Sequence, residues 1–325
     1  MKKMFLAPML LMSLSSPAQH ALHLLPYPKP VQQEVSDTYF GKVVKDPYRW
    51  LEDDHSAETA AWVEAENRVT RDYLMQIPFR DKVNKELSRM WNYEKFSGAF
   101  KEGNYYLYYR NDGLQNQSVL YIQNGKDGKP EEFINPNTLN AAGTSALGSV
   151  SFSKTQKYCA YSVSDAGSDW QKICILQTEP RKLLKEEIQY SKFSGISWKG
   201  DEGFYYSGYD RPSEKDQFSA KTEFQKIFFH KIGTSQSADV LIYEDKQNPL
   251  IYKGAALSED QRWLMLNLAQ GTDGTELQFM DLKDKNQKKF KVLCPGFSNN
   301  YDFVTNIDGR FLIYTNFEAP NYRLV

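Results

Sequence analysis

Histidine and cysteine are scarce in this sequence, with four and three residues among 325. The chain contains no His-Glu-x-x-His motif, no paired Cys-x-x-Cys and no glycine-rich loop of the kind that cradles phosphate. The sequence therefore contains no recognisable residues for metal-dependent hydrolysis or for nucleotide binding. We expect no metal site and no cofactor.

A long hydrophobic run and an excess of charge of one sign are also absent. The 40 basic and 41 acidic side chains leave a formal net charge of −1, which gives no electrostatic reason to expect a nucleic-acid partner. No stretch reaches the roughly 20 apolar residues needed to span a bilayer. We therefore expect no membrane partner.

A shorter apolar run, Met4–Leu14, lies near the N-terminus. Lys2 and Lys3 precede it, and Ser16-Pro17-Ala18 follows it. Positive residues, a short apolar stretch and small residues in this order are typical of a signal peptide. We predict a signal peptide over residues 1–18 and a periplasmic or secreted protein. The alternative is a partly buried N-terminal helix.

A serine nucleophile is not recognisable. An α/β-hydrolase places its catalytic serine in a Gly-x-Ser-x-Gly turn between a strand and a helix. The nearest approaches, Gly143-Thr-Ser-Ala-Leu and Gly195-Ile-Ser-Trp-Lys, both lack the final glycine. His230 ends an apolar stretch and is interpreted as a strand or edge residue. We assign no catalytic residue to this chain.

The three cysteines, Cys159, Cys174 and Cys294, are an odd number and do not suggest a disulfide framework. Cys159 and Cys174 flank a turn at residues 165–169. A symmetric hairpin would place them opposite each other, about 4.5–5.5 Å apart between Cα atoms, which a disulfide accepts. A one-residue slip would turn them to opposite faces. A single bridge and three buried thiols both remain open.

The N-terminal part of the mature chain, residues 19–92, combines an arm with two helices. Residues 26–52 are rich in proline and tyrosine and lack helical periodicity, so we expect an extended arm that lies on another part of the protein. Ser56 is a plausible N-cap for a helix running to about Gln76, and Pro78 lies just beyond its end. A second helix is expected from about Phe79 to Trp91.

From about residue 93 the pattern changes to short aromatic strands separated by turns. A strongly apolar strand recurs about every 50 residues, and a shorter strand precedes it in most units. The apolar strands are 105–109, 158–162, 204–207, 263–266 and 311–314; the preceding strands are 150–152, 195–198, 255–257 and 302–304. This period is typical of a β-propeller. The alternative is a β-sandwich, whose turns recur every 8–12 residues.

Five such units are visible over residues 93–325, and the fifth is incomplete. We therefore expect a mainly β chain that forms an incomplete propeller of about five blades. An arc that does not close exposes apolar blade faces and an unpaired edge strand. On this ground the chain is expected to be truncated and to lack a partner.

Several segments resemble the prolyl oligopeptidase family over about residues 26–325. The N-terminal signature is similar in the run Asp46-Pro47-Tyr48-Arg49-Trp50-Leu51-Glu52-Asp53, which is followed by the helix-like stretch 58–67. The segments 164–170, 257–260 and 319–324 also resemble propeller segments of that family.

The resemblance implies a seven-bladed propeller that caps an α/β-hydrolase domain and limits access to short peptides, which a Ser/Asp/His triad cleaves after proline. It implies that this chain carries about five blades and that the C-terminal hydrolase domain, with the triad, is missing. By position, Phe193, Tyr252 and Thr272 match propeller residues that face the substrate. Structural strand or turn roles would also explain these three residues.

Three other interpretations remain. The parent enzyme could be the related oligopeptidase that cleaves after basic residues, although residues 113–117 and the pair Asp169-Trp170 favour the prolyl branch. A non-catalytic exported propeller that binds a ligand is the alternative from a different class, and it requires a closed ring. An inactive fragment is the third.

Overall fold

The computed structural model describes residues 25–53, 56–211 and 222–325. The chain divides into two compact units, the first ending at Met90 and the second covering Trp91–Val325. The signal peptide expected at residues 1–18 lies outside the described residues. None of the described helices is long and apolar enough to cross a membrane.

The arm in the first unit contains a hairpin that the sequence pattern did not predict. Strands β1 (Ser36–Tyr39) and β2 (Lys42–Lys45) pair antiparallel. Phe40 and Gly41 make the turn, with φ of 51° and 79°. Two-residue hairpin turns of this kind favour Asn-Gly or Asp-Gly, so a phenylalanine in the first position concealed the turn. Arg49 ties the arm together through ion pairs with Asp37 and Asp46.

Three helices follow: the 3₁₀ helix η1 (Arg49–Glu52), α1 (Ala57–Met75) and α2 (Arg80–Trp91). The predicted N-cap is confirmed, because the Thr59 N–H donates to Ser56 Oγ at 3.0 Å. Four apolar side chains repeat at helical spacing along α2 and the residue before it, and they are exposed. Phe79, Val83, Leu87 and Met90 are 61%, 47%, 58% and 64% exposed.

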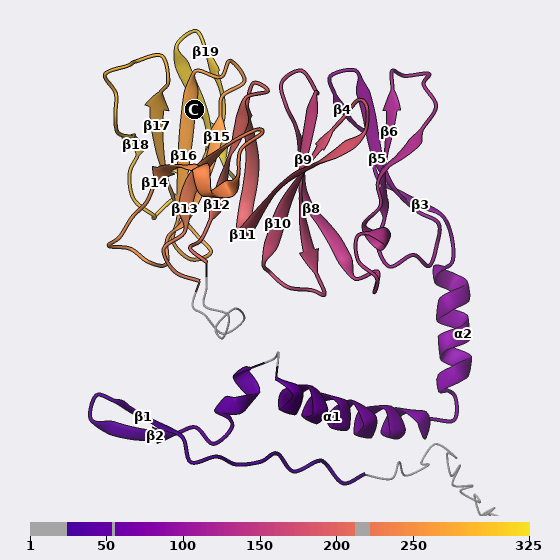
Figure 1. Ribbon diagram of the computed structural model, residues 1–325. Coiled ribbons are helices and arrows are strands. Elements are labelled where there is room, and N and C mark those ends of the chain that lie inside the picture. The colour runs from indigo at the N-terminus through magenta and orange to yellow at the C-terminus, as the bar shows by residue number, and fades with distance from the viewer. Residues whose placement is uncertain (1–24, 54–55, 212–221) are drawn as a thin grey trace, which may run out of the picture. The chain divides into compact units, whose positions relative to one another are not determined.

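The second unit is a row of β-blades in chain order (Figure 1). Blade 1 contains β3 (Lys95–Phe96), β4 (Phe100–Glu102), β5 (Tyr105–Asn111), β6 (Val119–Asn124) and β7 (Glu131–Ile134). Blade 2 contains β8 (Ser145–Phe152), β9 (Tyr158–Asp165), β10 (Gln171–Gln177) and the first part of β11 (Lys182–Lys199). All strand pairs within the blades are antiparallel.

Blade 3 contains the second part of β11 with β12 (Gly203–Gly208), β13 (Lys226–Lys231) and β14 (Val240–Tyr243). Blade 4 contains β15 (Tyr252–Leu257), β16 (Trp263–Ala269), β17 (Thr275–Asp281) and β18 (Lys291–Cys294). Blade 5 contains β19 (Tyr301–Ile307), β20 (Arg310–Thr315) and β21 (Arg323–Leu324). The five recurring apolar strands are β5, β9, β12, β16 and β20, so the predicted repeat is confirmed.

Strand β11 joins blades 2 and 3 into one sheet of seven strands. Its first half pairs with β10 and its second half with β12. The register with β12 breaks between Ser191 and Ile196. Within and beside this break, Tyr190 and Phe193 have φ of 59° and 52°, a region that non-glycine residues seldom adopt. The strand therefore bends as it passes from one blade to the next.

The core is divided among the four seams between neighbouring blades. The clusters include Leu107, Phe133 and Phe152 between blades 1 and 2; Ile188, Trp198 and Phe204 between blades 2 and 3; Ile227, Ile251 and Leu266 between blades 3 and 4; and Met265, Leu277 and Ile313 between blades 4 and 5. Each blade buries its apolar strand against a neighbour, as expected for propeller packing.

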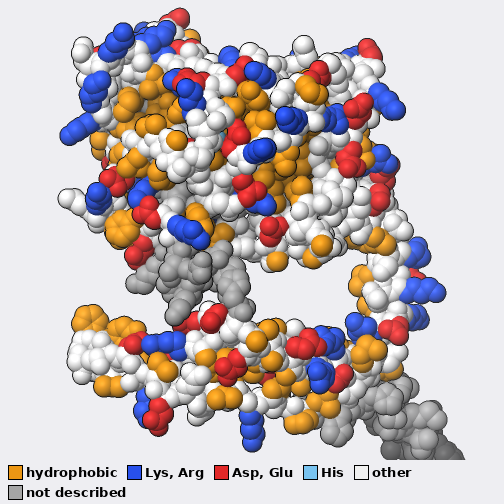
Figure 2. Space-filling view, viewed as in Figure 1, with side chains coloured by type: hydrophobic (Ala, Val, Ile, Leu, Met, Phe, Trp, Pro, Cys, Tyr) orange, Lys and Arg blue, Asp and Glu red, His pale blue; other side chains and the backbone are white. Residues whose placement is uncertain are grey.

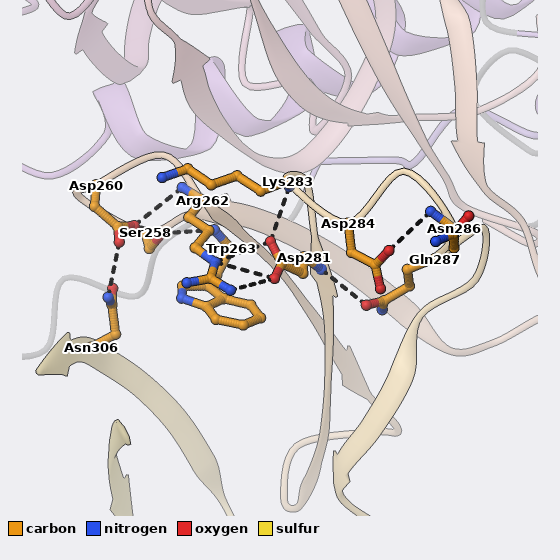
Figure 3. Close-up of polar contacts among 10 residues, drawn as sticks. All are labelled: Ser258, Asp260, Arg262, Trp263, Asp281, Lys283, Asp284, Asn286, Gln287 and Asn306. Carbon is orange, nitrogen blue, oxygen red and sulfur yellow. Dashed lines mark hydrogen bonds and ion pairs between the residues drawn. The ribbon is translucent and has the colours of Figure 1, made fainter. Parts of the chain in front are cut away.

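Polar contacts link the turns between the first and second strands of successive blades. Thr155 Oγ1 donates to Asp201 Oδ2 at 2.5 Å, and the Gly200 N–H donates to Gln261 Oε1 at 2.9 Å. In blade 4, Asp260 accepts from Asn306 of blade 5 at 3.0 Å (Figure 3). Contacts from each blade to the next therefore hold this end of blades 2 to 5 together.

Of the two interpretations left open for the cysteines, the structure excludes a bridge between Cys159 and Cys174, which do not face each other across β9 and β10. Cys159 lies opposite Leu176, and Cys174 lies opposite Tyr161, a displacement of two residues. All three cysteines are free. Cys159 and Cys174 nevertheless belong to the same apolar cluster.

The displacement arises from the turn between β9 and β10. The Ser168 N–H donates to Asp165 O at 3.0 Å, which closes a tight turn. Asp169 and Trp170 follow this turn before β10 begins at Gln171, so the β10 side carries two additional residues. The Trp170 ring packs against Tyr209 of blade 3 at 5.6 Å between ring centroids, which explains why this residue leaves the strand ladder.

Candidate peptide-contacting site

Two of the three predicted substrate-facing residues lie together at the end of blades 3 and 4 opposite the turn contacts of Figure 3. Phe193 lies at the bend of β11, and Tyr252 begins β15. Their rings meet edge to face, 5.4 Å apart between centroids. Phe193 is 58% exposed and Tyr252 is 37% exposed. The pair therefore presents aromatic surface to solvent across the seam between two blades.

Thr272 lies in the exposed turn between β16 and β17. It follows Ala269, which pairs with Tyr252 across β15 and β16. The turn therefore lies at the same end of blade 4 as Tyr252. The structure places Thr272 near the aromatic pair along the strand ladder and records no contact between it and either ring.

Lys192 supports the aromatic pair, and the sequence analysis missed it. Its ammonium lies 5.3 Å from the Phe193 ring centroid and 5.4 Å from that of Trp170. It also forms an ion pair with Asp169 at 3.3 Å. The Lys192 side chain is 13% exposed. A cation held between two rings and a carboxylate fixes the position of this part of β11.

Gln225 joins the first strands of blades 3 and 4 beneath the aromatic pair. Its amide Nε2 donates to Lys192 O at 2.9 Å, and its Oε1 accepts from the Lys253 N–H at 2.6 Å. Ser207 Oγ donates to Lys253 O at 2.6 Å. The Lys253 side chain is buried, its ammonium donates to Ile251 O at 2.8 Å, and burial lowers its pKa. These contacts hold Phe193 and Tyr252 at fixed separation.

Tyr209 is a second tyrosine near this cluster. It is 8% exposed, and its hydroxyl is buried with no hydrogen-bond partner among the described residues. Burial is the main cause that raises the pKa of its phenol, and the nearby Tyr252 raises it further. Tyr209 is therefore a buried, neutral aromatic side chain next to the exposed pair.

His230 is a strand residue, as predicted, and the structure adds a buried carboxylate partner. His230 Nδ1 lies 2.7 Å from Asp239 Oδ1, and Tyr206 donates to Asp239 Oδ2 at 2.7 Å. The histidine is fully buried and packs on Phe204, with ring centroids 5.4 Å apart. A buried histidine of this kind joins β13 to the segment before β14 and cannot reach a substrate from solvent.

Among the described residues, no group of three or more His, Cys, Asp or Glu side chains is placed to hold a metal ion. The candidate site consists instead of aromatic rings, a lysine and a threonine. Such a surface can pack against the side chains and backbone of a peptide. It contains no group arranged as a nucleophile with its base.

Comparison with known proteins decides the family. The model of the prolyl oligopeptidase N-terminal beta-propeller domain matches residues 27–325. The chain belongs to the prolyl oligopeptidase family. It corresponds to the N-terminal portion of that family, as the sequence motifs predicted.

Relatives of this family match almost the whole chain. Prolyl endopeptidase of Elizabethkingia meningoseptica is 49% identical over 304 residues, which cover 93% of this chain and 43% of that protein. Prolyl oligopeptidase A of Amanita bisporigera is 32% identical and is covered to 44% of its length. This chain therefore spans less than half the length of these relatives.

Solved structures agree with the fold. Prolyl oligopeptidase B from Galerina marginata, bound to a 35mer hydrolysis and macrocyclization substrate, matches with a TM-score of 0.74 and 28% identity over 92% of this chain and 45% of that one. Oligopeptidase B from Leishmania major matches with a TM-score of 0.72 at 18% identity, over 92% of this chain and 44% of that one. The second likeness concerns the fold alone.

Proposed function

We propose that this chain is the propeller part of an exported serine endopeptidase that cleaves short peptides after proline. The observation that carries the proposal is the exposed pair Phe193–Tyr252, held across two blades of a prolyl oligopeptidase propeller. The similarity to proteins named Prolyl endopeptidase supports the choice of proline over basic residues.

In this proposal the propeller contacts the peptide, and a C-terminal α/β-hydrolase domain outside this sequence cleaves it. Phe193 and Tyr252 pack on apolar side chains of the peptide, because exposed aromatic rings gain from contact with apolar and ring surfaces. The Thr272 hydroxyl donates to or accepts from the peptide backbone. The exposed apolar face of α2 and the β1–β2 arm contact the hydrolase domain.

The chain alone is expected to be inactive, because acyl transfer needs an activated serine and no motif for one occurs in this sequence. The signal peptide over residues 1–18 exports the protein to the periplasm or beyond. Turnover of a proline-containing chromogenic peptide by the purified chain, abolished by a serine-directed inhibitor, would contradict this part of the proposal.

A chimaera tests the proposed role. The chain is joined to the part of the Elizabethkingia meningoseptica enzyme that lies beyond the matched region, and hydrolysis of proline-containing and arginine-containing chromogenic peptides is measured. We expect cleavage of the proline peptide. Preference for the arginine peptide would favour the oligopeptidase alternative. A folded, inactive chimaera that still binds peptide would favour the non-catalytic module.

The same chimaera tests the contact residues. Phe193→Ala should raise KM for the proline peptide by about three- to tenfold, because one aromatic contact is lost. Phe96→Ala is the matched control, since Phe96 of blade 1 is also 58% exposed. Equal effects of the two substitutions would remove Phe193 from the site.

A further inference from the structure

A separate cavity of about 240 Å³ lies at the seam between blades 1 and 2. Its floor contains Ile122 and Thr178, which are 4% and 2% exposed, and its remaining walls are polar. The lining residues are Tyr105, Ile122, Asn124, Lys129, Glu131, Thr178, Glu179 and Arg181. The cavity is distinct from the aromatic pair, which lies between blades 3 and 4.

Two polar contacts hold the walls together across the seam. Tyr105 of blade 1 donates from its hydroxyl to Glu179 Oε1 at 2.8 Å, and burial raises the pKa of this phenol to about 12. Arg181 of blade 2 donates to Glu131 Oε2 at 2.8 Å and to Glu132 O at 2.6 Å. Hydrogen bonds and an ion pair therefore hold the walls together before any ligand binds. This lowers the entropy that the lining side chains lose on binding.

Within the described ranges of the chain, one buried lining group has no hydrogen-bond partner, and two lining charges are not balanced by an ion pair. The Thr178 hydroxyl is buried and has no hydrogen-bond partner in the described part of the chain. Such a buried group destabilises a fold unless a ligand or water satisfies it. Lys129 and Glu179 carry opposite charges, and neither belongs to an ion pair among residues 25–53, 56–211 and 222–325.

The charges also balance over the whole lining. Lys129 and Arg181 offset Glu131 and Glu179, so a ligand with net charge would leave one side chain uncompensated. A ligand with one positive and one negative group matches Lys129 and Glu179 together. The cavity is smaller than the range of about 300–1,000 Å³ typical of drug-sized ligands.

We propose that this cavity binds a small zwitterion, namely a free amino acid or a dipeptide. The ligand carboxylate pairs with the Lys129 ammonium, the ligand ammonium pairs with the Glu179 carboxylate, and the Thr178 hydroxyl bonds to the ligand at the floor. The site is separate from the candidate peptide-contacting site, because its lining residues belong to blades 1 and 2 and not to blades 3 and 4.

Binding of glycylglycine to the purified chain, measured by isothermal titration calorimetry, tests the proposal. We expect saturable binding that is weakened about tenfold or more by Lys129→Met and by Glu179→Gln, since each removes a charge-assisted contact. Lys126→Met is the matched control from the same turn and should bind as the wild type does. N-Acetylglycinamide, which carries no charge, should not bind.

The floor is tested by Thr178→Val, which keeps the side-chain shape and removes the hydroxyl. We expect this variant to bind glycylglycine more weakly and to melt at the same temperature as the wild type or higher, because an unsatisfied buried hydroxyl has been removed. Thr178→Ser should retain binding. The proposal would be overturned if the wild type did not bind glycylglycine or if the charge variants bound it equally well. It would also be overturned if the Thr178 hydroxyl bonded only to an ordered water.

Discussion

The pair Arg262–Asp281 shows how single side chains secure the turns of blade 4 (Figure 3). Arg262 Nη2 donates to Asp281 Oδ2 at 2.7 Å, and Nε donates to Oδ1 at 3.1 Å. The guanidinium also stacks 4.4 Å from the Trp263 ring centroid. The hydrogen bond from Arg262 is the main cause that lowers the pKa of Asp281. A planar fork on a carboxylate is a geometry that lysine would not reproduce.

This pair should make the stability of the chain depend on pH in the acidic range. Because the pKa of Asp281 is lower in the folded chain than its ordinary value of 3.8, its contribution is present above about pH 4 and is lost as the pH falls through the folded pKa. Asp281→Asn should therefore unfold at lower urea than the wild type at pH 7, and the difference should shrink below pH 4.

Asp284→Asn provides the control for this prediction. Asp284 lies in the same turn and accepts from the Asn286 N–H at 2.9 Å without an arginine partner. The urea concentration at which Asp284→Asn unfolds should match that of the wild type across the pH range. An Asp281→Asn difference that stays constant down to pH 2 would show that the carboxylate charge is not the cause.

The cysteines give a second prediction for single residues. Burial raises the pKa of Cys159 and of Cys174, the latter to about 11, and Cys159 is fully buried. Since the thiolate is the reactive form, both should react slowly with a thiol reagent at pH 8, whereas the half-buried Cys294 reacts first. Three thiols should be counted after unfolding. A count of one would instead demonstrate a disulfide.

Among the strands, the central ones of each blade could be predicted and the connections between blades could not. β5, β9, β12, β16 and β20 are recognisable because most of their residues are buried or half-buried, so that each carries a run of apolar and aromatic side chains. The continuity of β11 escapes prediction because its bend depends on positive φ at Tyr190 and Phe193, which no local residue preference indicates.

The same limit applies to the candidate site. Phe193 and Tyr252 could be proposed from their resemblance to a family, yet Lys192, Trp170 and Gln225 could not. These residues come from three distant segments, and only the packing of blades 2 to 4 brings them together. Each of these residues occupies an ordinary strand or turn position, so no sequence pattern indicates that contact.

Gln225 should be essential to the seam between blades 3 and 4. Gln225→Leu leaves the Lys253 N–H and Lys192 O without a partner in a buried place, at a cost of about 1–3 kcal/mol for each unsatisfied group. We expect the free energy of unfolding, measured in urea, to fall by about 2–4 kcal/mol. Gln247→Leu, at an exposed turn, should change it by less than about 0.5 kcal/mol. Similar values for the two variants would contradict the role of Gln225.

At the scale of the whole molecule, the face drawn in Figure 2 shows hydrophobic side chains on the blades with charged ones among and around them. At the blade 5 end of the second unit, Val304, Ile307 and Leu324 are 50%, 57% and 57% exposed. Strand β21 pairs only with β20 among the described strands. An apolar surface beside an unpaired strand edge favours association with another surface of the same kind.

The purified chain should therefore self-associate as its concentration rises. Ile307→Lys should reduce this association, because a lysine at a sheet edge opposes pairing with a second chain. Leu114→Lys is the matched control, since Leu114 is 56% exposed in blade 1, away from this edge, and it should associate as the wild type does. Light scattering over a range of concentrations measures the mass directly. A mass that stays monomeric at every concentration, or an equal effect of the two lysines, would show that the blade 5 edge does not drive association.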